Sequence, residues 1–228
     1  MKKQSAINVK AIIVGGGSST RMGFDKLFAE FGNQTVIEHS INAFTKCSFV
    51  SGIIIVINNN NKKRLEDIVA NIETDKAINI VEGGTTRRNS VAKGLELINK
   101  ECSYVAIHDG ARPYINPEQI RKVLEAAKEY GAAASGRPIT DTIKKCDRDS
   151  KVIGSIPREF LWAMETPQIF KYQTIKEAYD LVIKNDIQVT DEASAVIHYG
   201  KTVKIVQDEW KNPKITFPED LNSKPPSL

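Results

Sequence analysis

The sequence lacks any apolar run long enough to cross a membrane. The apolar stretch at residues 11–14, behind a start that contains three lysines, is far too short for a transmembrane helix or for the core of a signal peptide. We therefore expect a cytoplasmic protein with no membrane partner.

Cysteine is also scarce. The three cysteines, Cys47, Cys102 and Cys146, are odd in number, lie far apart and form no C-x-x-C pair. The sequence therefore predicts neither a disulfide framework nor a zinc site, and we interpret the thiols as buried or incidental.

A strong excess of one charge is missing as well. The 32 basic and 28 acidic residues give a net charge of +4, and no window carries a dense stripe of lysine and arginine. This excludes the footprint that is typical of nucleic-acid binding and favours a small anionic substrate.

The size and balance of the chain suit one domain. Its 228 residues are 41% hydrophobic and 26% charged, which predicts a single globular unit with a substantial core. We assign this domain to residues 1–221 and expect the end at 222–228, rich in proline and serine, to be flexible.

Apolar runs rich in β-branched residues alternate with segments of helical spacing. Strands are predicted at 9–14, 52–57, 77–81, 103–107, 132–138 and 202–206. Helices are predicted at 35–44, 62–72, 86–98, 117–130, 175–184 and 192–199. The alternation predicts an α/β fold, with a Rossmann-like, mostly parallel sheet and helices on both faces.

One polar segment departs from this pattern. Residues 141–158 are broken by Gly154 and Pro157 and contain two short stretches of alternating polarity. They predict a β-hairpin arm, at about residues 139–160, that projects from the sheet within the same domain.

A glycine-rich loop follows the first predicted strand and is expected to extend to the helix at residue 35. Gly15, Gly16 and Gly17 let backbone N–H groups approach phosphate oxygens closely, and Arg21 and Lys26 add positive charge. Because open α/β sheets bind ligands at this edge, the loop predicts a polyphosphate site, with a flexible connector as the alternative.

Two familiar phosphate-binding motifs do not fit this sequence, either in this loop or elsewhere. The dinucleotide fingerprint G-x-G-x-x-G would need glycine where Thr20 stands and a helix directly afterwards. The P-loop motif is half matched by Gly200-Lys201-Thr202, but that stretch follows a predicted helix rather than a strand.

Two more polar clusters follow the third and fourth predicted strands. Gly84 precedes a helix that carries Ser90, and the N-terminus of such a helix favours anions. In H-D-G-A-R-P, Asp109 is the best candidate for a metal ligand in the chain, whereas we interpret His108 as a hydrogen-bonded structural residue.

These clusters, taken in order, resemble a known family. The matching motifs run from residue 11 to 221: G-G-G-x-x-x-R-M, Gly83-Gly84, H-D-G-A-R-P, Asp141-Thr142, Leu161-Trp162, T-P-Q, T-D-E-A-S and Lys214. In these motifs the chain is similar to the 2-C-methyl-D-erythritol 4-phosphate cytidylyltransferases of the non-mevalonate isoprenoid pathway. The resemblance implies transfer of a cytidylyl group from CTP to methylerythritol phosphate, with release of pyrophosphate.

The resemblance also implies a role for each matching residue. CTP would be held by Gly15, Gly16, Gly17, Gly84, Ser90 and Gly110. The catalytic charges would be those of Arg21, Lys26, Asp109 and Lys214, with Asp109 also binding Mg²⁺. The sugar phosphate would be held by Arg112, Thr142, Arg158 and Thr190. In this family Thr142 and Arg158 lie on the arm and reach the neighbouring subunit's site, so a homodimer through the arm is implied.

Two alternatives stay open at this point. A cytidylyltransferase for ribitol 5-phosphate or another pentitol phosphate would share the loop, although Leu161-Trp162 and T-D-E-A-S favour methylerythritol phosphate. An inactive nucleotide-binding relative would keep the fold, although the retained charged residues argue against it. The clusters hold no nucleophilic triad, which suits a reaction whose attacking group is the substrate's own phosphate.

Overall fold

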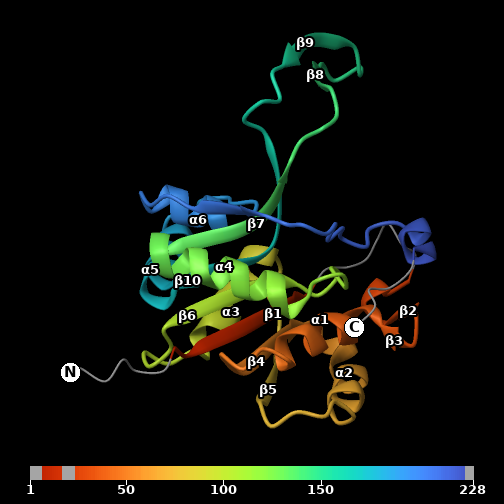
Figure 1. Ribbon diagram of the computed structural model, residues 1–228, viewed down its shortest axis with the longest axis vertical. Coiled ribbons are helices and arrows are strands. Elements are labelled where there is room, and N and C mark those ends of the chain that lie inside the picture. The colour runs from red at the N-terminus through yellow and green to blue at the C-terminus, as the bar shows by residue number, and fades with distance from the viewer. Residues whose placement is uncertain (1–6, 17–23, 224–228) are drawn as a thin grey trace.

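The computed structural model describes residues 7–16 and 24–223 (Figure 1). The helices in this part of the chain are α1 Val36–Thr45, α2 Lys62–Val69, α3 Arg87–Glu96, α4 Pro117–Tyr130, α5 Tyr172–Lys184 and α6 Glu192–His198. Its strands are β1 Val9–Gly15, β2 Glu30–Phe31, β3 Gln34–Thr35, β4 Val50–Ile57, β5 Ala77–Glu82, β6 Tyr104–Asp109, β7 Ala132–Pro138, β8 Ile143–Cys146, β9 Val152–Ile156, β10 Trp162–Lys171 and β11 Lys204–Gln207. Short 3₁₀-helices lie at Lys26–Phe28, Asn59–Asn61 and Pro218–Asn222.

Seven of these strands form one sheet in the order β11-β7-β10-β6-β1-β4-β5. In this sheet β10 runs antiparallel to both of its neighbours, and every other pair is parallel. The predicted, mostly parallel sheet is therefore confirmed. Because parallel strands end at the same edge, the segments after β1, β5 and β6 come together there.

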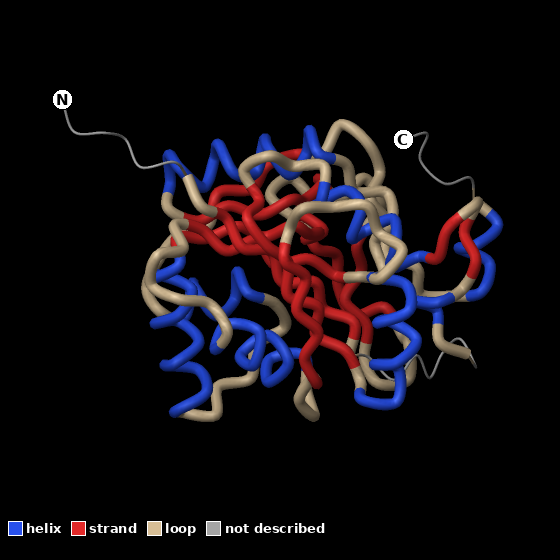
Figure 2. Tube along the Cα trace, turned by 90° about the horizontal axis from the view of Figure 1, so that it is seen from below, coloured by secondary structure: helices blue, strands red, loops and turns tan. Residues whose placement is uncertain are grey.

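Helices cover both faces of the sheet (Figure 2). Successive side chains of a strand point to opposite faces. On one face, Ile13 of β1 packs in a hydrophobic cluster with Ile41 of α1 and Val123 of α4. On the other face, Ile12 packs in a second cluster with Val91 of α3 and residues of α5 and α6. Each fully buried side chain of this kind contributes about 1.5–3 kcal/mol, so both helix layers hold the sheet edge in place.

Helix α4 begins and ends at the residues that its sequence signals indicate. The Asn116 side chain accepts a hydrogen bond of 2.9 Å from the backbone N–H of Gln119, and Pro117 occupies the first turn. Gly131 ends the helix with a left-handed φ of 85°, a conformation that glycine adopts without strain.

No helix within the described residues is both long and apolar enough to span a bilayer.

Most other predicted elements are confirmed to within two residues. Two helices differ by three residues at one end. The helix predicted at 62–72 is too long, because α2 ends at Val69, and the one predicted at 175–184 is too short, because α5 begins at Tyr172. Ile72 continues the apolar helical spacing into the turn beyond α2.

The sequence did not predict β10. Thr166 and Pro167 lie in the middle of this strand, at a register irregularity between Met164 and Gln168 in its pairing with β7. A proline normally argues against a central strand, because it has no N–H to donate to a neighbouring strand.

The loop expected to run to residue 35 is partly structured. Its residues 17–23 lie outside the described part of the chain, but Lys26–Phe28 forms a 3₁₀-helix and β2 pairs with β3. The expectation of an uninterrupted loop was therefore wrong.

The predicted arm projects from the body between β7 and β10 (Figure 1). At its base the N–H of Ile139 donates to the carbonyl of Leu161 at 2.9 Å, and near its tip β8 pairs antiparallel with β9. Asp147 closes the turn, because its Oδ1 accepts from the backbone N–H groups of Asp149 and Lys151, each at 2.9 Å. The projecting hairpin is thereby confirmed.

The end predicted to be flexible lies mostly outside the described residues. Up to Ser223 the chain is anchored: the Asp220 carboxylate accepts from the backbone N–H groups of Thr216 and Phe217, and the Tyr114 hydroxyl contacts Ser223 Oγ at 2.5 Å. The domain boundary at residue 221 stays a prediction.

Candidate active site

Gly15 ends β1 at the carboxyl edge of the sheet. A Cβ atom on Gly15 would lie 2.8 Å from Leu27 Cδ1, and one on Gly16 would lie 3.3 Å from Ser90 Oγ. The chain therefore needs small residues to pass between these side chains. Gly17 and Arg21 lie outside the described residues, and their roles stay predictions.

Lys26 opens the 3₁₀-helix that follows this loop. Asp25 precedes it and accepts a hydrogen bond of 3.1 Å from the backbone N–H of Leu27, while its second carboxylate oxygen contacts Asn61. Leu27 and Phe28 are buried. The buried pair anchors the turn, and Lys26 occupies a half-buried position at its start.

Ser90 of α3 organises the glycine turn after β5. Its buried hydroxyl accepts from the N–H of Gly84 at 3.1 Å and donates to the carbonyl of Thr86 at 2.9 Å. A Cβ on Gly84 would lie only 2.4 Å from Asn89 Cβ. Gly84 and Ser90, which were both predicted to bind CTP, thus shape the same turn.

Asp109 lies at the end of β6, where three cationic side chains converge on its carboxylate. Arg87 donates to Oδ1 at 3.0 and 3.2 Å, Lys214 donates to Oδ2 at 2.9 Å, and Arg112 Nε lies 3.5 Å from Oδ2. Burial alone would raise the pKa of Asp109, but the three cations hold it well below its usual range. The next residue, Gly110, donates its N–H to the β1 carbonyl that precedes Gly15, at 2.9 Å.

Arg87 joins two carboxylates that are 83 positions apart in the chain. Its guanidinium also pairs with Glu192, which is fully buried at the start of α6, with Nη2 donating to Oε2 at 3.0 Å. The Tyr179 hydroxyl donates to the other Glu192 oxygen at 3.0 Å. Burial alone would lower the pKa of Arg87, but the charges of Glu192 and Asp109 outweigh burial and hold this pKa above its usual value. The arginine is therefore a fixed positive charge beneath Asp109.

Arg112 is held as tightly as Arg87. Its Nη1 donates to the backbone carbonyl of Asn212 at 2.7 Å, and Nη2 lies 3.5 Å from the carbonyl of Met164. Asn212 is buried in turn, and its amide donates to the carbonyl of Thr166 at 2.8 Å. These contacts leave the Arg112 side chain only 12% exposed, so its predicted contact with the sugar phosphate would be made by the exposed edge of the guanidinium.

His108 is completely buried, and both of its ring nitrogens have hydrogen-bond partners, Thr166 and the backbone of Arg112. Burial lowers its pKa to about 3, with Arg112 acting in the same direction. A neutral imidazole without solvent contact confirms the interpretation of His108 as a structural residue.

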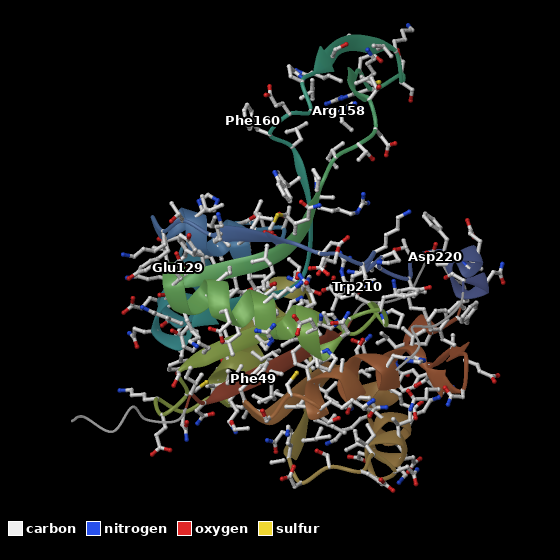
Figure 3. All side chains as sticks on the ribbon, in the orientation of Figure 1. Phe49, Glu129, Arg158, Phe160, Trp210 and Asp220 are labelled. Atoms are coloured by element: carbon white, nitrogen blue, oxygen red, sulfur yellow. The ribbon has the colours of Figure 1, made fainter. Side chains whose placement is uncertain are left out.

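The remaining predicted substrate residues lie away from Asp109. Thr142 and Arg158 are exposed on the arm, where Arg158 contacts the carbonyl of Thr140, and Figure 3 shows Arg158 well above the body. Thr190 is exposed just before α6, with its hydroxyl 3.1 Å from Ser194 Oγ. A single chain therefore does not bring the two arm residues to the sheet edge.

The charges at the edge suit an anionic ligand. Arg87, Arg112 and Lys214 meet two carboxylates, those of Asp109 and Glu192, so this cluster carries one net positive charge. Glycine turns lie on both sides of it, after β1 and β5. Fixed cations beside glycine turns are an arrangement that suits polyphosphates.

Asp109 also fits the chemistry of a magnesium ligand. Among the described residues no three His, Cys, Asp or Glu side chains lie together as a metal site. Mg²⁺ commonly takes only one or two carboxylates and completes its shell with water and substrate phosphates. One carboxylate, that of Asp109 beside the end of β1, matches that donor set.

Sequence reasoning missed Glu192 and Asn212. Glu192 had a signal, because it lies in T-D-E-A-S and is the acidic residue in the first turn of a helix. Asn212 had none: it lies in an irregular segment, and its partners Thr166 and Arg112 are 46 and 100 positions away in the chain.

Comparisons with known proteins agree on one family. The profile of the 2-C-methyl-D-erythritol 4-phosphate cytidylyltransferases matches residues 9–224. The chain is 38% identical over 218 residues to the enzyme of that name from Caldanaerobacter subterraneus subsp. tengcongensis, covering 94% of this chain and 96% of the relative. It is also 38% identical to the one from Alkaliphilus oremlandii, covering 92% and 90%.

Solved structures give the same result for the fold. The 4-diphosphocytidyl-2C-methyl-D-erythritol synthase of Anaerococcus prevotii superposes with a TM-score of 0.83 at 28% identity, covering 95% of this chain and 96% of that one. The Francisella tularensis 2-C-methyl-D-erythritol 4-phosphate cytidylyltransferase gives a TM-score of 0.80 at 27% identity, covering 94% and 97%.

Proposed function

This chain belongs to the 2-C-methyl-D-erythritol 4-phosphate cytidylyltransferase family, and from that premise we propose that the sheet edge around Asp109 is its reaction site. The enzyme transfers the cytidylyl group of CTP to 2-C-methyl-D-erythritol 4-phosphate and releases pyrophosphate. The observation that carries the site assignment is the convergence of Arg87, Arg112 and Lys214 on Asp109 between two glycine turns.

The attacking group is the phosphate of the sugar substrate. Its second pKa is about 6, so at neutral pH it is mostly a dianion and needs no general base. Neutral His108 is buried and plays no part in proton transfer. The barrier instead comes from bringing an anion up to the α-phosphate of CTP, while charge grows on the leaving pyrophosphate.

Positive side chains offset that charge. Arg21, Lys26 and Lys214 are the groups we assign to the triphosphate. Lys214 is held by Asp109 at 2.9 Å, so its charge is already placed at the edge where CTP would bind. A preorganised cation of this kind stabilises the transition state more than the ground state.

Backbone at the glycine positions binds the nucleotide itself. We assign this role to the turns that contain Gly15, Gly16 and Gly17, and Gly84 with Ser90, and to Gly110. The N–H groups of Gly84 and Gly110 already donate within the protein, so these two glycines contribute by leaving room for the ligand to approach. The lack of room for a side chain on Gly15 and on Gly84 supports this, because a ligand can approach the backbone closely where there is no Cβ.

Mg²⁺ is the cofactor that fits this site, with Asp109 as its ligand from the protein. When bound, it would draw negative charge from the phosphates of CTP. Arg87 would keep the Asp109 carboxylate ionised and oriented for that purpose, because it holds Oδ1 through two hydrogen bonds.

The arm supports a homodimer. Its side chains Val152, Ile153 and Phe160 are 63%, 58% and 84% exposed, and a two-stranded hairpin with uncovered apolar side chains is marginally stable alone. Packing against a second subunit would cover them. Thr142 and Arg158 would then reach the partner's sugar-phosphate site, with Arg112 and Thr190 supplied by the body.

Pyrophosphate release is the direct test. We expect turnover with CTP and 2-C-methyl-D-erythritol 4-phosphate, and much slower turnover when UTP, ATP or GTP replaces CTP. The full-length match to methylerythritol phosphate enzymes favours this substrate over ribitol 5-phosphate. Faster turnover with ribitol 5-phosphate, or CTP binding without turnover, would support one of the two alternatives instead.

A further inference from the structure

Glu165 and Asp208 lie on either side of β7, and their carboxyl groups meet. Glu165 follows Met164, which pairs with Gly136 of β7, and the backbone N–H of Asp208 donates to the carbonyl of the same glycine at 3.3 Å. Glu165 is only 4% exposed. The two strands therefore carry their carboxylates to the same level of the sheet.

No donor satisfies the facing oxygens of this pair. Oε2 of Glu165 and Oδ2 of Asp208 are buried and receive no hydrogen bond from any N–H or O–H group of the described residues. The Asp208 carboxyl lies close enough to that of Glu165 for a hydrogen bond to form between them. Two carboxyl groups make such a contact only when one of them carries a proton.

The charged groups around the pair do not replace that proton. Arg137 of β7 holds the other Glu165 oxygen, with Nε 3.2 Å from Oε1. Burial and the facing Glu165 raise the pKa of Asp208 to about 8, although Arg112, after β6, and Lys122 of α4 act to lower it.

Asp208 is also the first residue of the segment that carries Lys214 to the site. This 208–214 segment has no regular secondary structure and crosses the carboxyl edge, with Trp210 near its middle (Figure 3). Beyond its end, the N–H of Ile215 donates to the carbonyl of Ala111 at 2.8 Å. One end of the segment is thus fixed beside β6, and the other is held by Asp208 together with Lys122 of α4, which pairs with Glu209.

We infer that Glu165 and Asp208 share one proton at neutral pH and that this pair positions the 208–214 segment, so that Lys214 meets Asp109 and Asn212 meets Arg112. The inference rests on the role proposed above for Lys214. When the proton is lost, two like charges face each other in a buried place and must separate. Glu165 is held by Arg137 within the sheet, so Asp208, at the end of the edge strand β11, moves and takes the segment with it.

The first test follows the carboxyl groups directly. The full-length enzyme, labelled with ¹³C at its aspartate and glutamate carboxyl carbons, is titrated by NMR from pH 5 to pH 10, and the Asp208 signal is identified from its loss in Asp208→Asn. We expect this signal to titrate near pH 8. Titration of every aspartate below pH 6 would overturn the shared proton, as would displacement of that proton by added Mg²⁺, which would make the pair a cation site.

The second test asks whether the pair positions Lys214. An amide can donate to the facing carboxylate without a titratable proton, so Asp208→Asn and Glu165→Gln should keep the segment in place at high pH. The wild-type kcat should fall by about tenfold between pH 7.5 and pH 9.5, and that of the two amide variants by less than about twofold, each relative to its own value at pH 7.5. Glu101→Gln, which changes an exposed carboxylate outside the segment, is the control and should follow the wild type.

The outcomes separate this inference from the proposed function. If kcat of Asp208→Asn falls as steeply as that of the wild type, the pair does not position the segment. If Lys214→Ala turns over at the wild-type rate, the role proposed for Lys214 is wrong, whereas the NMR titration still decides whether the proton is shared. Because Glu165→Gln alters the other partner, one misfolded variant does not leave the inference untested.

Discussion

The Thr166 hydroxyl lies 2.9 Å from Nδ1 of His108 and donates its proton to that nitrogen. The direction is fixed because the neutral ring has one proton, which lies on Nε2 since the carbonyl that faces Nε2 can only accept. The Thr166 oxygen in turn accepts the backbone N–H of Asp109 at 3.1 Å. Nε2 of His108 then carries the ring proton and faces the carbonyl of Arg112 at 3.3 Å. A neutral histidine in one tautomer thus ties together the backbone on both sides of the reaction site.

This contact makes the stability of the fold depend on pH. The pKa of His108 is about 3 in the folded chain, because burial disfavours the charged ring, and about 6.5 in the unfolded chain. Between these values only the unfolded chain binds the proton. The contribution of His108 is therefore fully present above pH 6.5 and is lost as the pH falls, at about 1.4 kcal/mol per pH unit.

Urea unfolding of the wild type and of His108→Asn at several pH values measures this. The difference in free energy of unfolding between the two should shrink as the pH falls from 6.5 towards 4. His198→Asn, which removes an exposed histidine, is the control. A difference for His108→Asn that does not change with pH would mean that the buried ring takes up a proton as readily in the folded chain as in the unfolded chain.

The buried ion pair of Arg87 and Glu192 predicts a large loss of stability. Glu192→Ala leaves a desolvated guanidinium without one of its two carboxylates, and it leaves the Tyr179 hydroxyl without an acceptor. Removing one partner of a buried pair costs about 3–5 kcal/mol. Glu96→Ala, at an exposed position of α3, should cost less than about 1 kcal/mol. Equal losses in urea unfolding would show that the pair does not support the fold.

The sequence predicts the parts of this molecule that depend on local patterns. Runs such as that of β4 and the capping residues of α4 identify strands and helices, because burial and capping act within a few residues. The shared carboxyl edge follows from the parallel order. The glycine turns and Asp109 could therefore be assigned to one site before any contact was known.

Contacts between distant segments could not be predicted in this way. Nothing local to β10 indicates that Thr166 reaches His108, 58 positions away, or that Asn212 holds Arg112. The motif H-D-G-A-R-P favours an anion-binding role for Arg112, yet the fold surrounds the guanidinium of this residue with backbone carbonyls. Such pairings are decided by the order of strands in the sheet. The alternation of strands and helices along the sequence does not specify that order.

Lys26 should matter for rate rather than for folding. Lys26→Ala removes a positive charge from the proposed triphosphate site, and loss of one preorganised group commonly lowers kcat by about 10² to 10³. The melting temperature should stay close to that of the wild type, because Leu27 and Phe28, which anchor this turn, are unchanged. Lys63→Ala, whose side chain is 82% exposed on α2, is the matched control. A full-rate Lys26→Ala enzyme would remove Lys26 from the mechanism.

The position of Arg158 on the arm leads to a prediction that holds only if the protein is a dimer. Arg158→Ala should raise KM for the sugar phosphate and leave KM for CTP near the wild-type value, because Arg158 is assigned to the partner's sugar-phosphate site. When equal amounts of the Arg158→Ala and Lys26→Ala enzymes are mixed and their subunits exchange freely, half of the dimers contain one subunit of each variant. Each such dimer has one site built from an intact body and an intact arm, so activity at low sugar phosphate should recover to about one quarter of the wild type.

A mixture of Lys26→Ala with Lys214→Ala is the control for this recovery. Both changes affect the body, so no mixed dimer contains an intact site, and the mixture should show only the sum of the two residual activities. Light scattering on each sample gives the molar mass and checks that subunits are paired. Recovery in the control to the same level would mean that the arm is not what one subunit supplies to the other, and a monomeric wild type would rule out exchange through Val152 and Phe160 altogether.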